Sequence, residues 1–540
     1  MLYSLFETVS LLHIGDMTSA SIWVAFSFFF YFIANRVYKS HVYSAKLRKF
    51  DCQDPVPKET ISRWPFGLDI IKPALEADRG KLFPVFLQRN AERFGITTWK
   101  YTLMNTSSVF TVDPKNIKAV LATQFEVFDL GPMRIGAFWP MLGKGIFTQD
   151  GHGWRVTRDM MRPQFNRDQM SDFEVEETHV QNLMRAIDTR LQGEWTEEID
   201  LQVLFFRLTM DSATEILLGQ SADSQLLSLP ENQTKAQGIR IDFAAEFDNA
   251  LSWVSTRGRF ADKYWLVTSK GFKNSCNKCN EYVDHFVQLA LKRNELAKDQ
   301  GKDDSAATKK RYIYLDALAK ETQDPIELRS QCLHLMLAGR DTTASLLGWL
   351  FLLFAQNPNH YQKLRNIIIE NFGTYENPSE ITFLSLKNCR YLQHCLHEAL
   401  RLYPLVPINV RQANKDTTLP YGGGKDGNSK VFIPKGSIVE YSVFVMQRRK
   451  DLWGDDAEEF RPERWEGRKA GWEFLPFNGG ARICIGQQFA LNEAGYVTAR
   501  LLQRFDMVRD MATDPVVKHE VRLTDSSANG VKVKLHASTA

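Results

Sequence analysis

A cysteine in a glycine-rich loop is the residue with the clearest chemical potential in this chain. Cys484 lies in the run Phe477-Asn478-Gly479-Gly480-Ala481-Arg482-Ile483-Cys484-Ile485-Gly486. Glycines let backbone N–H groups approach a ligand closely, and such groups stabilise a thiolate by donating to its sulfur. The following run, Gln487–Leu502, has helical periodicity, so Cys484 would precede a helix N-terminus, where negative charge is favoured. The loop is suited to hold a thiolate ligand for a metal; the alternative is a buried cysteine in a turn.

A second group of polar residues interrupts a long apolar segment. Asp324-Pro325 is typical of a helix start and Pro358 of a stop, which predicts one helix over Pro325–Asn357, about 50 Å long. Its second half is apolar nearly all round and is expected to be buried. Its middle reads Ala338-Gly339-Arg340-Asp341-Thr342-Thr343, where buried Asp and Thr need partners. This pattern indicates either function or a kink in which a threonine hydroxyl bonds to the preceding turn.

These residues match a known pattern. The cysteine loop resembles the haem-ligating loop of the cytochrome P450 family, Phe-x-x-Gly-x-Arg-x-Cys-x-Gly, at every fixed position. The helix segment resembles the family's Ala-Gly-x-Asp-Thr-Thr. Further motifs follow the family's order and extend the resemblance over the whole chain. They are Trp154 with Arg158, Glu398 with Arg401, Arg411 ten residues later, and Phe460-Arg461-Pro462-Glu463-Arg464-Trp465.

The resemblance implies a fold, a cofactor and a set of roles. The fold would be mainly α with small β-sheets, the cytochrome P450 fold, and the cofactor a thiolate-ligated haem (iron protoporphyrin IX). Cys484 would be the iron ligand, in a loop that begins at Phe477. Asp341 and Thr342 would deliver protons during oxygen activation. The haem propionates would be compensated by Trp154, Arg158, Arg411 and Arg482, and a structural ion triad behind the haem would consist of Glu398, Arg401 and Arg464.

The source of electrons is expected to be another protein. The sequence shows no flavin or nicotinamide fingerprint. The segment after the haem loop is too short for a fused reductase domain. The expected partner is therefore a separate NADPH–cytochrome P450 reductase.

The N-terminal region predicts a membrane anchor. Met17–Asn35 contains no charged residue and is rich in aromatic side chains; as a helix it would span about 28 Å, close to the thickness of a bilayer core. A basic flank follows, Arg36 to Lys49, which places the body in the cytosol. We predict a single-pass endoplasmic reticulum protein with an anchor at 1–40 and a haem-thiolate monooxygenase domain at 41–540. A cleavable signal peptide is the alternative.

Composition limits the function classes. The chain has 540 residues, with 67 Lys+Arg against 64 Asp+Glu, a net charge of +3. Such a near-neutral balance argues against nucleic acid as a partner. The seven cysteines are too few for a disulfide scaffold. Among the remaining classes, the resemblance implies monooxygenation, and the alternatives are a haem-thiolate isomerase or dehydratase and a non-catalytic haem protein.

The substrate is expected to be a long, apolar small molecule. Several stretches, among them Phe247–Ala250, Ser442–Asp451 and Gly486–Leu491, resemble the fungal branch that hydroxylates n-alkanes and fatty acids. The segment Asp525–Gly530 is more polar than is usual in that branch. We therefore expect a polar end on the substrate, with hydroxyl donors from Ser526 and Ser527 and a charge from Arg134; the alternative is tailoring of a fungal secondary metabolite.

Overall fold

The computed structural model describes residues 2–56, 64, 67–103, 106–165, 173–229, 232, 243–299 and 312–538, without the side chains of residues 2–22, 25, 68 and 297–299. The helices are α1 Leu2–Lys49, α2 Leu68–Arg79, α3 Phe83–Phe94, α4 Pro114–Lys118, α5 Gly131–Leu142, α6 Gly151–Met161, α7 Glu174–Asp188, α8 Leu201–Leu218, α9 Ser224–Leu227, α10 Phe243–Arg259, α11 Lys270–Asp299, α12 Tyr314–Glu321, α13 Pro325–Gln356, α14 Pro358–Phe372, α15 Phe383–Asn388, α16 Arg390–Leu402, α17 Val443–Met446, α18 Lys450–Trp453 and α19 Gln487–Arg504. The strands are β1 Thr98–Leu103, β2 Thr106–Thr111, β3 Phe128–Asp129, β4 Leu191–Gln192, β5 Trp195–Thr196, β6 Ile199–Asp200, β7 Ile408–Ala413, β8 Thr417–Gly423, β9 Ser429–Ile433, β10 Ile438–Ser442, β11 Phe505–Asp510, β12 His519–Val521, β13 Asp525–Ser527 and β14 Lys532–Ala537.

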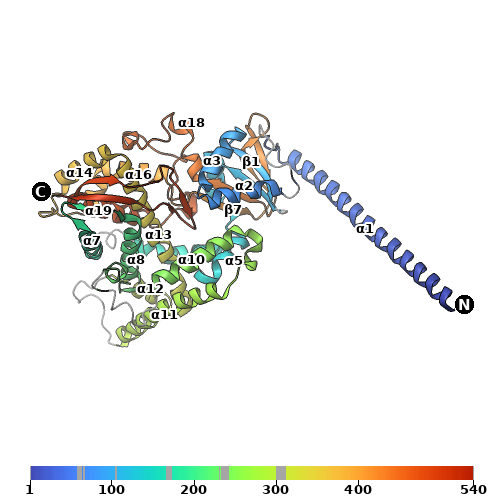
Figure 1. Ribbon diagram of the computed structural model, residues 1–540, viewed down its shortest axis with the longest axis horizontal. Helices are drawn as coiled ribbons and strands as arrows, with labels where there is room; N and C mark the ends of the chain where they lie inside the picture. Colours follow the sequence, from blue (N-terminus) through green and yellow to red (C-terminus); the bar gives the residue numbers. More distant parts are fainter. Residues whose placement is uncertain are drawn as a thin grey trace.

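The body is mainly helical, as predicted, with small sheets at its edges (Figure 1). One five-stranded sheet has the order β1-β2-β10-β7-β3 and lies near the end of the body from which α1 extends. In it, β2 and β10 pair in parallel, which joins segments more than 300 residues apart. The other end of the body holds α7, α8, α14, α16 and α19. This end also holds the second five-stranded sheet, with the order β11-β14-β5-β4 and β6 paired with β14, so α13 lies between two parts that each combine helices and strands (Figure 1).

The long central helix forms as predicted. It begins after Asp324, whose side chain accepts a hydrogen bond from the Ile326 N–H at 2.9 Å, and it ends at Gln356, immediately before the Asn357 expected from the sequence. Residues 328–337 pack in one apolar cluster with α5, α10, α11 and α12. Residues 344–355 pack in another with α7, α8, α14, α16 and α19. The polar residues in the middle of α13 therefore lie between two apolar cores, where they need hydrogen-bond partners.

The predicted helix after the cysteine loop is α19. It starts at Gln487, three residues beyond Cys484, and its residues from Leu491 onward are buried against the rest of the body. The glycine-rich stretch Tyr421–Asn428 predicts a turn in a short β region, and in the structure it joins β8 and β9 in an antiparallel hairpin.

The apolar alternation of Glu520–Leu535 predicts a hairpin, and the structure differs from this in part. β12 pairs with β13, but β14 pairs with β11, β5 and β6 instead of continuing that hairpin. Register explains the difference, because Val508 and Leu535 are directly opposite each other and both are buried. Apolar alternation identified the strands but could not identify their partners.

The N-terminal helix projects from the body (Figure 1). Its last turns contact the body: the Tyr43 ring lies 5.7 Å from that of Phe432, and Lys46 forms a 2.7 Å ion pair with Asp416. The helix therefore continues past residue 40, where the sequence placed a boundary.

The membrane-spanning prediction for Met17–Asn35 is not supported by a detected span. Residues 17–22 and 25 of that segment lie outside the described side chains. In the part of the chain whose side chains are described, no helix combines the length and the apolar character needed to cross a membrane.

Two further segments lie largely outside the described residues. Three prolines predict a stiff connector at 51–65, of which residues 57–63 and 65 are outside. The polar, charged run 298–311 predicts a surface loop, and its first two residues end α11.

Candidate functional site

The cysteine loop presents one thiol. Cys484 is exposed, whereas the other six cysteines of the chain are buried. Protein atoms nevertheless surround the sulfur, and this burial raises the pKa of the thiol, while a Gly486 N–H and the Arg158 cation act in the opposite direction. The thiol thus lies at an interior surface and faces groups that would stabilise its ionised form.

The local backbone explains why this loop needs its residues. The Cys484 N–H donates to the Phe477 carbonyl at 3.0 Å, which closes the loop on itself. Gly480 has φ of +66°, and a Cβ there would lie 1.9 Å from the Leu121 carbonyl oxygen. Only glycine fits this approach, so Gly480 fixes the path of the chain between Phe477 and Cys484.

Three arginines from different parts of the chain converge near this loop. Arg482, in the turn Gly480–Arg482, forms a 2.7 Å ion pair with Asp150. Burial and the nearby Arg411 cation lower its pKa to about 9. Arg411, on β7, is buried and donates to the Asn409 side chain at 3.0 Å. Arg411 and Arg482 together carry two positive charges, whereas Asp150 supplies one negative charge.

The third arginine is Arg134, which we expected to supply a charge to the polar end of a substrate. It lies on α5 and donates to the same Asn409 oxygen, at 2.9 Å, as Arg411 does. Burial and Arg411 lower the pKa of Arg134 to about 10. The Nε atoms of Arg134 and Arg482 are buried without a hydrogen-bond partner among the described residues. Their N–H groups and surplus charge form a site for an anion.

The predicted pair on α6 lies beside this cluster. Trp154 is buried, and the guanidinium carbons of Arg482 and Arg158 lie 4.5 Å and 5.8 Å from its ring. Arg158 donates to the Ile483 carbonyl at 3.0 Å, next to Cys484. Burial lowers the pKa of Arg158, and the neighbouring Arg162 adds to this effect. The structure therefore brings Trp154, Arg158, Arg411, Arg482, Phe477 and Cys484 into one region.

These features fit a haem. A thiolate ligand needs an accessible cysteine with donors around its sulfur, and Cys484 provides it. The two propionates of a haem need buried cations with spare N–H groups. Arg134 and Arg482 have such groups, and Arg411 adds a buried cation beside them. On the central helix, a Cβ added to Gly339 would meet no protein atom within 4 Å, so α13 faces open space at this residue.

Asp341 and Thr342 occupy the polar middle of α13. The Thr342 hydroxyl donates to the Ala338 carbonyl at 2.5 Å, the back-bonded arrangement that the sequence left open as an alternative. Asp341 is buried and accepts a 3.1 Å hydrogen bond from Arg340. Burial raises the pKa of Asp341, although Arg340 opposes this. A hydroxyl and a carboxylate with a raised pKa, side by side in a core helix, could transfer protons.

The predicted ion triad is present on the far side of the loop. Arg401 donates to both oxygens of Glu398 at 2.9 Å, and Arg464 donates to one of them at 3.1 Å. All three side chains are buried. Arg401 also donates to the carbonyls of Gln447 and Ala457, which fixes the segment before the cysteine loop. The triad is therefore placed to act as a structural clamp.

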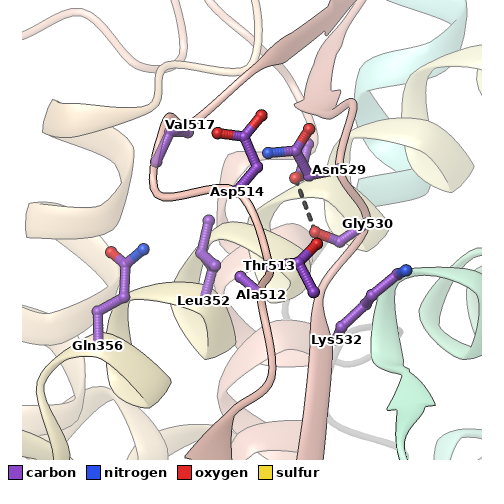
Figure 2. A pocket seen from close by; sticks show the side chains of 10 residues that line it. Leu352, Gln356, Ala512, Thr513, Asp514, Val517, Asn529, Gly530 and Lys532 are labelled. Atoms are coloured by element: carbon purple, nitrogen blue, oxygen red, sulfur yellow. Dashed lines mark hydrogen bonds between the residues drawn. The ribbon is translucent and has the colours of Figure 1, made fainter.

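The polar segment Asp525–Gly530 is buried in part and forms hydrogen bonds within the protein. Ser526 and Ser527 are buried in β13, and the Ser527 hydroxyl donates to the Gly530 carbonyl at 2.7 Å. Ser527 lines a pocket of about 210 Å³ with Leu352, Asp514 and Lys532, among others (Figure 2). Leu352 lies ten residues beyond Thr342, about 15 Å along a helix. Ser527 and Arg134 each have a hydrogen-bond partner within the protein, and the expectation that Ser526, Ser527 and Arg134 bind the polar end of a substrate stays a prediction.

Comparison with known proteins agrees with this geometry. The cytochrome P450 family model matches residues 64–529. The chain is 54% identical over 525 residues to cytochrome P450 monooxygenase g430 of Fusarium sp, covering 97% of this chain and 91% of the relative. It is 48% identical over 467 residues to cytochrome P450 52A3-A of Candida maltosa, covering 85% and 86%. It is 43% identical over 484 residues to cytochrome P450 monooxygenase alt2 of Alternaria solani, covering 87% and 88%.

The chain therefore belongs to the cytochrome P450 family. It is a monooxygenase, and the family implies a thiolate-ligated haem as its cofactor. Members of the family generally receive electrons from a reductase partner.

Proposed function

We propose that this enzyme hydroxylates a long, apolar small molecule, with Cys484 as the haem ligand. The reaction is R–H + O₂ + 2 electrons + 2 protons → R–OH + H₂O. Bound haem supplies the activation of dioxygen, which a thiolate ligand favours. The observation that carries the proposal is the meeting of an accessible thiol, Cys484, with a buried arginine cluster whose positive charge exceeds that of its one carboxylate partner, Asp150.

The chain's own residues would then hold and orient the cofactor. Arg134, Arg411 and Arg482 would neutralise the propionates, with the Trp154 indole packed against Arg482. Arg158 would stay beside the thiolate through its bond to the Ile483 carbonyl. Each of these cations is held by a different element, so cofactor binding would tie α5, α6, β7 and the cysteine loop together.

Asp341 and Thr342 would move protons to the reaction centre. Asp341 is buried but linked to charged groups, so it can exchange its proton while the apolar surroundings exclude bulk water. Thr342 would have to release the Ala338 carbonyl to take part. The presence of this pair argues against an isomerase or dehydratase, whose chemistry needs no proton delivery of this kind.

The substrate assignment is supported by the apolar character of the helices around α13. α5, α10 and residues 328–337 of α13 share one hydrophobic cluster, and Phe138 and Leu523 pack against it. Each buried methylene of a chain contributes about 0.8 kcal/mol. A long chain would therefore bind through many small contacts without a dedicated polar anchor.

Chain length is the test of this assignment. We expect matched alkanes, fatty alcohols and fatty acids with long chains to perturb the haem absorption spectrum. Shortening the chain by four methylenes should weaken binding by about 3 kcal/mol, roughly a hundredfold or more. The measurement is a spectral titration, with the three head groups compared at equal length. The best head group shows whether the substrate has a polar end.

A second candidate is the tailoring of a fungal secondary metabolite. This chain is more similar to the Fusarium monooxygenase, at 54% identity, than to the Candida maltosa 52A3-A protein, at 48%. Its substrate can therefore differ from that of the 52A proteins. If none of the three chain classes perturbs the spectrum, or if chain length has no effect, the fatty-chain assignment fails and this candidate replaces it.

We also propose that α1 attaches the enzyme to the endoplasmic reticulum membrane, with NADPH–cytochrome P450 reductase as the electron donor on the cytosolic side. Support comes from a run of large exposed side chains with no protein partner to cover them: Trp23 is 71% exposed and Phe30 is 74% exposed. Exposed apolar surface of this extent marks an interaction site. Basic residues in the last turn of α1 would face the negatively charged lipid surface.

Deletion of residues 1–35 tests the attachment. Most of the truncated protein should move from the membrane fraction to the soluble fraction, because the aromatic surface is gone, while haem remains bound. Haem content measured in both fractions is the control for folding. A truncated protein that stays with the membrane would contradict a role for α1, and a glycan on Asn105 or Asn232 of the full chain would contradict the orientation.

A further inference from the structure

A buried arginine beside Asp341 has no role in the mechanism described above. Arg340 belongs to α13, and its side chain is only 5% exposed. Its guanidinium lies near two rings, 5.1 Å from Phe206 of α8 and 5.9 Å from Phe247 of α10. A fully charged group in such a position must be held by counter-charge.

Two carboxylates share this guanidinium. One nitrogen of Arg340 contacts both Asp248 of α10 and, at 3.1 Å, Asp341. The second nitrogen bonds the other oxygen of Asp248 at 3.3 Å. Asp248 thus makes a two-point contact, and Asp341 competes with it for one nitrogen. The Asp248 side chain is 43% exposed, whereas that of Asp341 is 12% exposed.

The bond between Arg340 and Asp341 draws the carboxylate to one side of the helix. Residues at i and i+1 do not face each other on a helix, so this bond forms only if the two side chains turn toward each other. While the bond lasts, the Asp341 carboxylate is directed toward Arg340 and α10. Arginine remains protonated in proteins, so Arg340 cannot itself pass a proton on.

We propose that Asp248 and Arg340 form a latch that positions Asp341: Asp248 holds the guanidinium from the α10 side, which frees the Asp341 carboxylate to exchange and hand on a proton. The proposal rests on the proposed role of Asp341 in proton delivery. Asp248 and Arg340 act through Asp341 and are positioning residues.

The charges around Asp341 fix the direction of each effect. Burial raises its pKa, Arg340 lowers it, Asp248 raises it, and Arg522 from the β12–β13 turn lowers it. Removing the charge of Asp248 leaves Arg340 with one carboxylate, so Asp341 should be held more firmly as an anion and its pKa should fall. Removing the charge of Arg340 should have the opposite effect and raise it.

The experiment compares Asp248→Asn, Arg340→Gln and Asp341→Asn in the haem-loaded, full-length enzyme. The first readout does not depend on turnover: the carboxylic acid infrared band of Asp341, identified by its loss in Asp341→Asn, is titrated against pH. The second is product formed per NADPH across the same pH range. Glu246→Gln is the matched control, because Glu246 lies two residues before Asp248 on α10 and pairs with Lys278 of α11 instead.

The latch predicts shifts of opposite sign. The midpoint of the Asp341 band should move down in Asp248→Asn and up in Arg340→Gln, and stay in place in Glu246→Gln. Coupling in Asp248→Asn should fall several-fold at neutral pH and recover at lower pH. A merely structural tether between α10 and α13 would change both variants in the same direction or leave the midpoint unmoved, and either result overturns the proposal.

The outcomes separate the latch from the role of Asp341 itself. If Asp341→Asn leaves coupling unchanged, proton delivery by Asp341 is wrong. If Asp341→Asn uncouples the enzyme but the other two variants do not shift the midpoint, only the latch is wrong. Should Arg340→Gln fail to fold, the downward shift in Asp248→Asn decides the question, because Asp248 is half-exposed and its substitution is conservative.

Discussion

Cys484→Ala is expected to lose monooxygenase turnover completely. The side chain of alanine has no donor for iron, and the other six cysteines are buried away from this loop, so none can replace the sulfur. The thiolate is also what favours oxygen cleavage at a haem. Turnover is measured as product formed per haem, and the reduced variant should no longer give a thiolate-type spectrum with carbon monoxide.

Cys52→Ala is the matched control for this substitution. Cys52 is another free cysteine and lies just after the end of α1. Its thiol donates to the Phe50 carbonyl, which does not belong to the arginine cluster. It should retain both turnover and spectrum. A Cys484→Ala enzyme that still hydroxylated its substrate would show that the ligand has been assigned to the wrong residue.

Thr342→Ala is expected to separate electron use from product formation. General acid–base groups contribute typically 10²–10⁴-fold, so loss of the hydroxyl should lower product formation by roughly a hundredfold. Alanine is the best helix former, so α13 should remain intact and haem should stay bound. NADPH consumption should continue, with electrons leaving as hydrogen peroxide: NADPH + H⁺ + O₂ → NADP⁺ + H₂O₂. Product and peroxide are measured together.

Thr342→Ser retains the hydroxyl and should restore most of the coupling. This comparison distinguishes the two interpretations of Thr342. The hydroxyl bonds the Ala338 carbonyl at 2.5 Å in the structure, which is what a purely structural kink requires. Unchanged coupling in Thr342→Ala would favour that interpretation and move proton delivery elsewhere.

Local sequence patterns predicted the elements that carry the site. Asp324 as the helix cap and Pro325 as the first residue predicted the start of α13. The helical periodicity of the residues after Cys484 predicted α19. These features depend on residues close together in the chain, where propensity and capping decide the outcome. The triad of Glu398, Arg401 and Arg464 was implied by the family resemblance, and the structure contains it as a buried group.

Long-range pairing could not be predicted in the same way. Arg134 joins Arg411 because both reach Asn409, a contact across 275 residues that no local pattern shows. The one available signal was a charged residue in an apolar segment, and it suggested a substrate contact instead. Nor could the sequence show that the Ser527 hydroxyl donates to the Gly530 carbonyl.

The surroundings of the polar residues in the middle of α13 also could not be predicted from the sequence. Hydrophobic periodicity showed a buried helix but not that two separate cores cover its halves. Nor did it show that Arg340 would recruit Asp248 from α10. The conflict with local helix rules at Ala338–Thr343 predicts a functional segment, and that stays a prediction.

The carbon monoxide spectrum of the reduced full-length enzyme, recorded beside that of Cys484→Ala, tests the central claim most directly. That claim is a haem held by the Cys484 thiolate. The account predicts a thiolate-type Soret band for the natural enzyme and its loss in the variant, with haem content measured separately. A thiolate-type band that persists in Cys484→Ala, or that is absent from the haem-loaded natural enzyme, would contradict it.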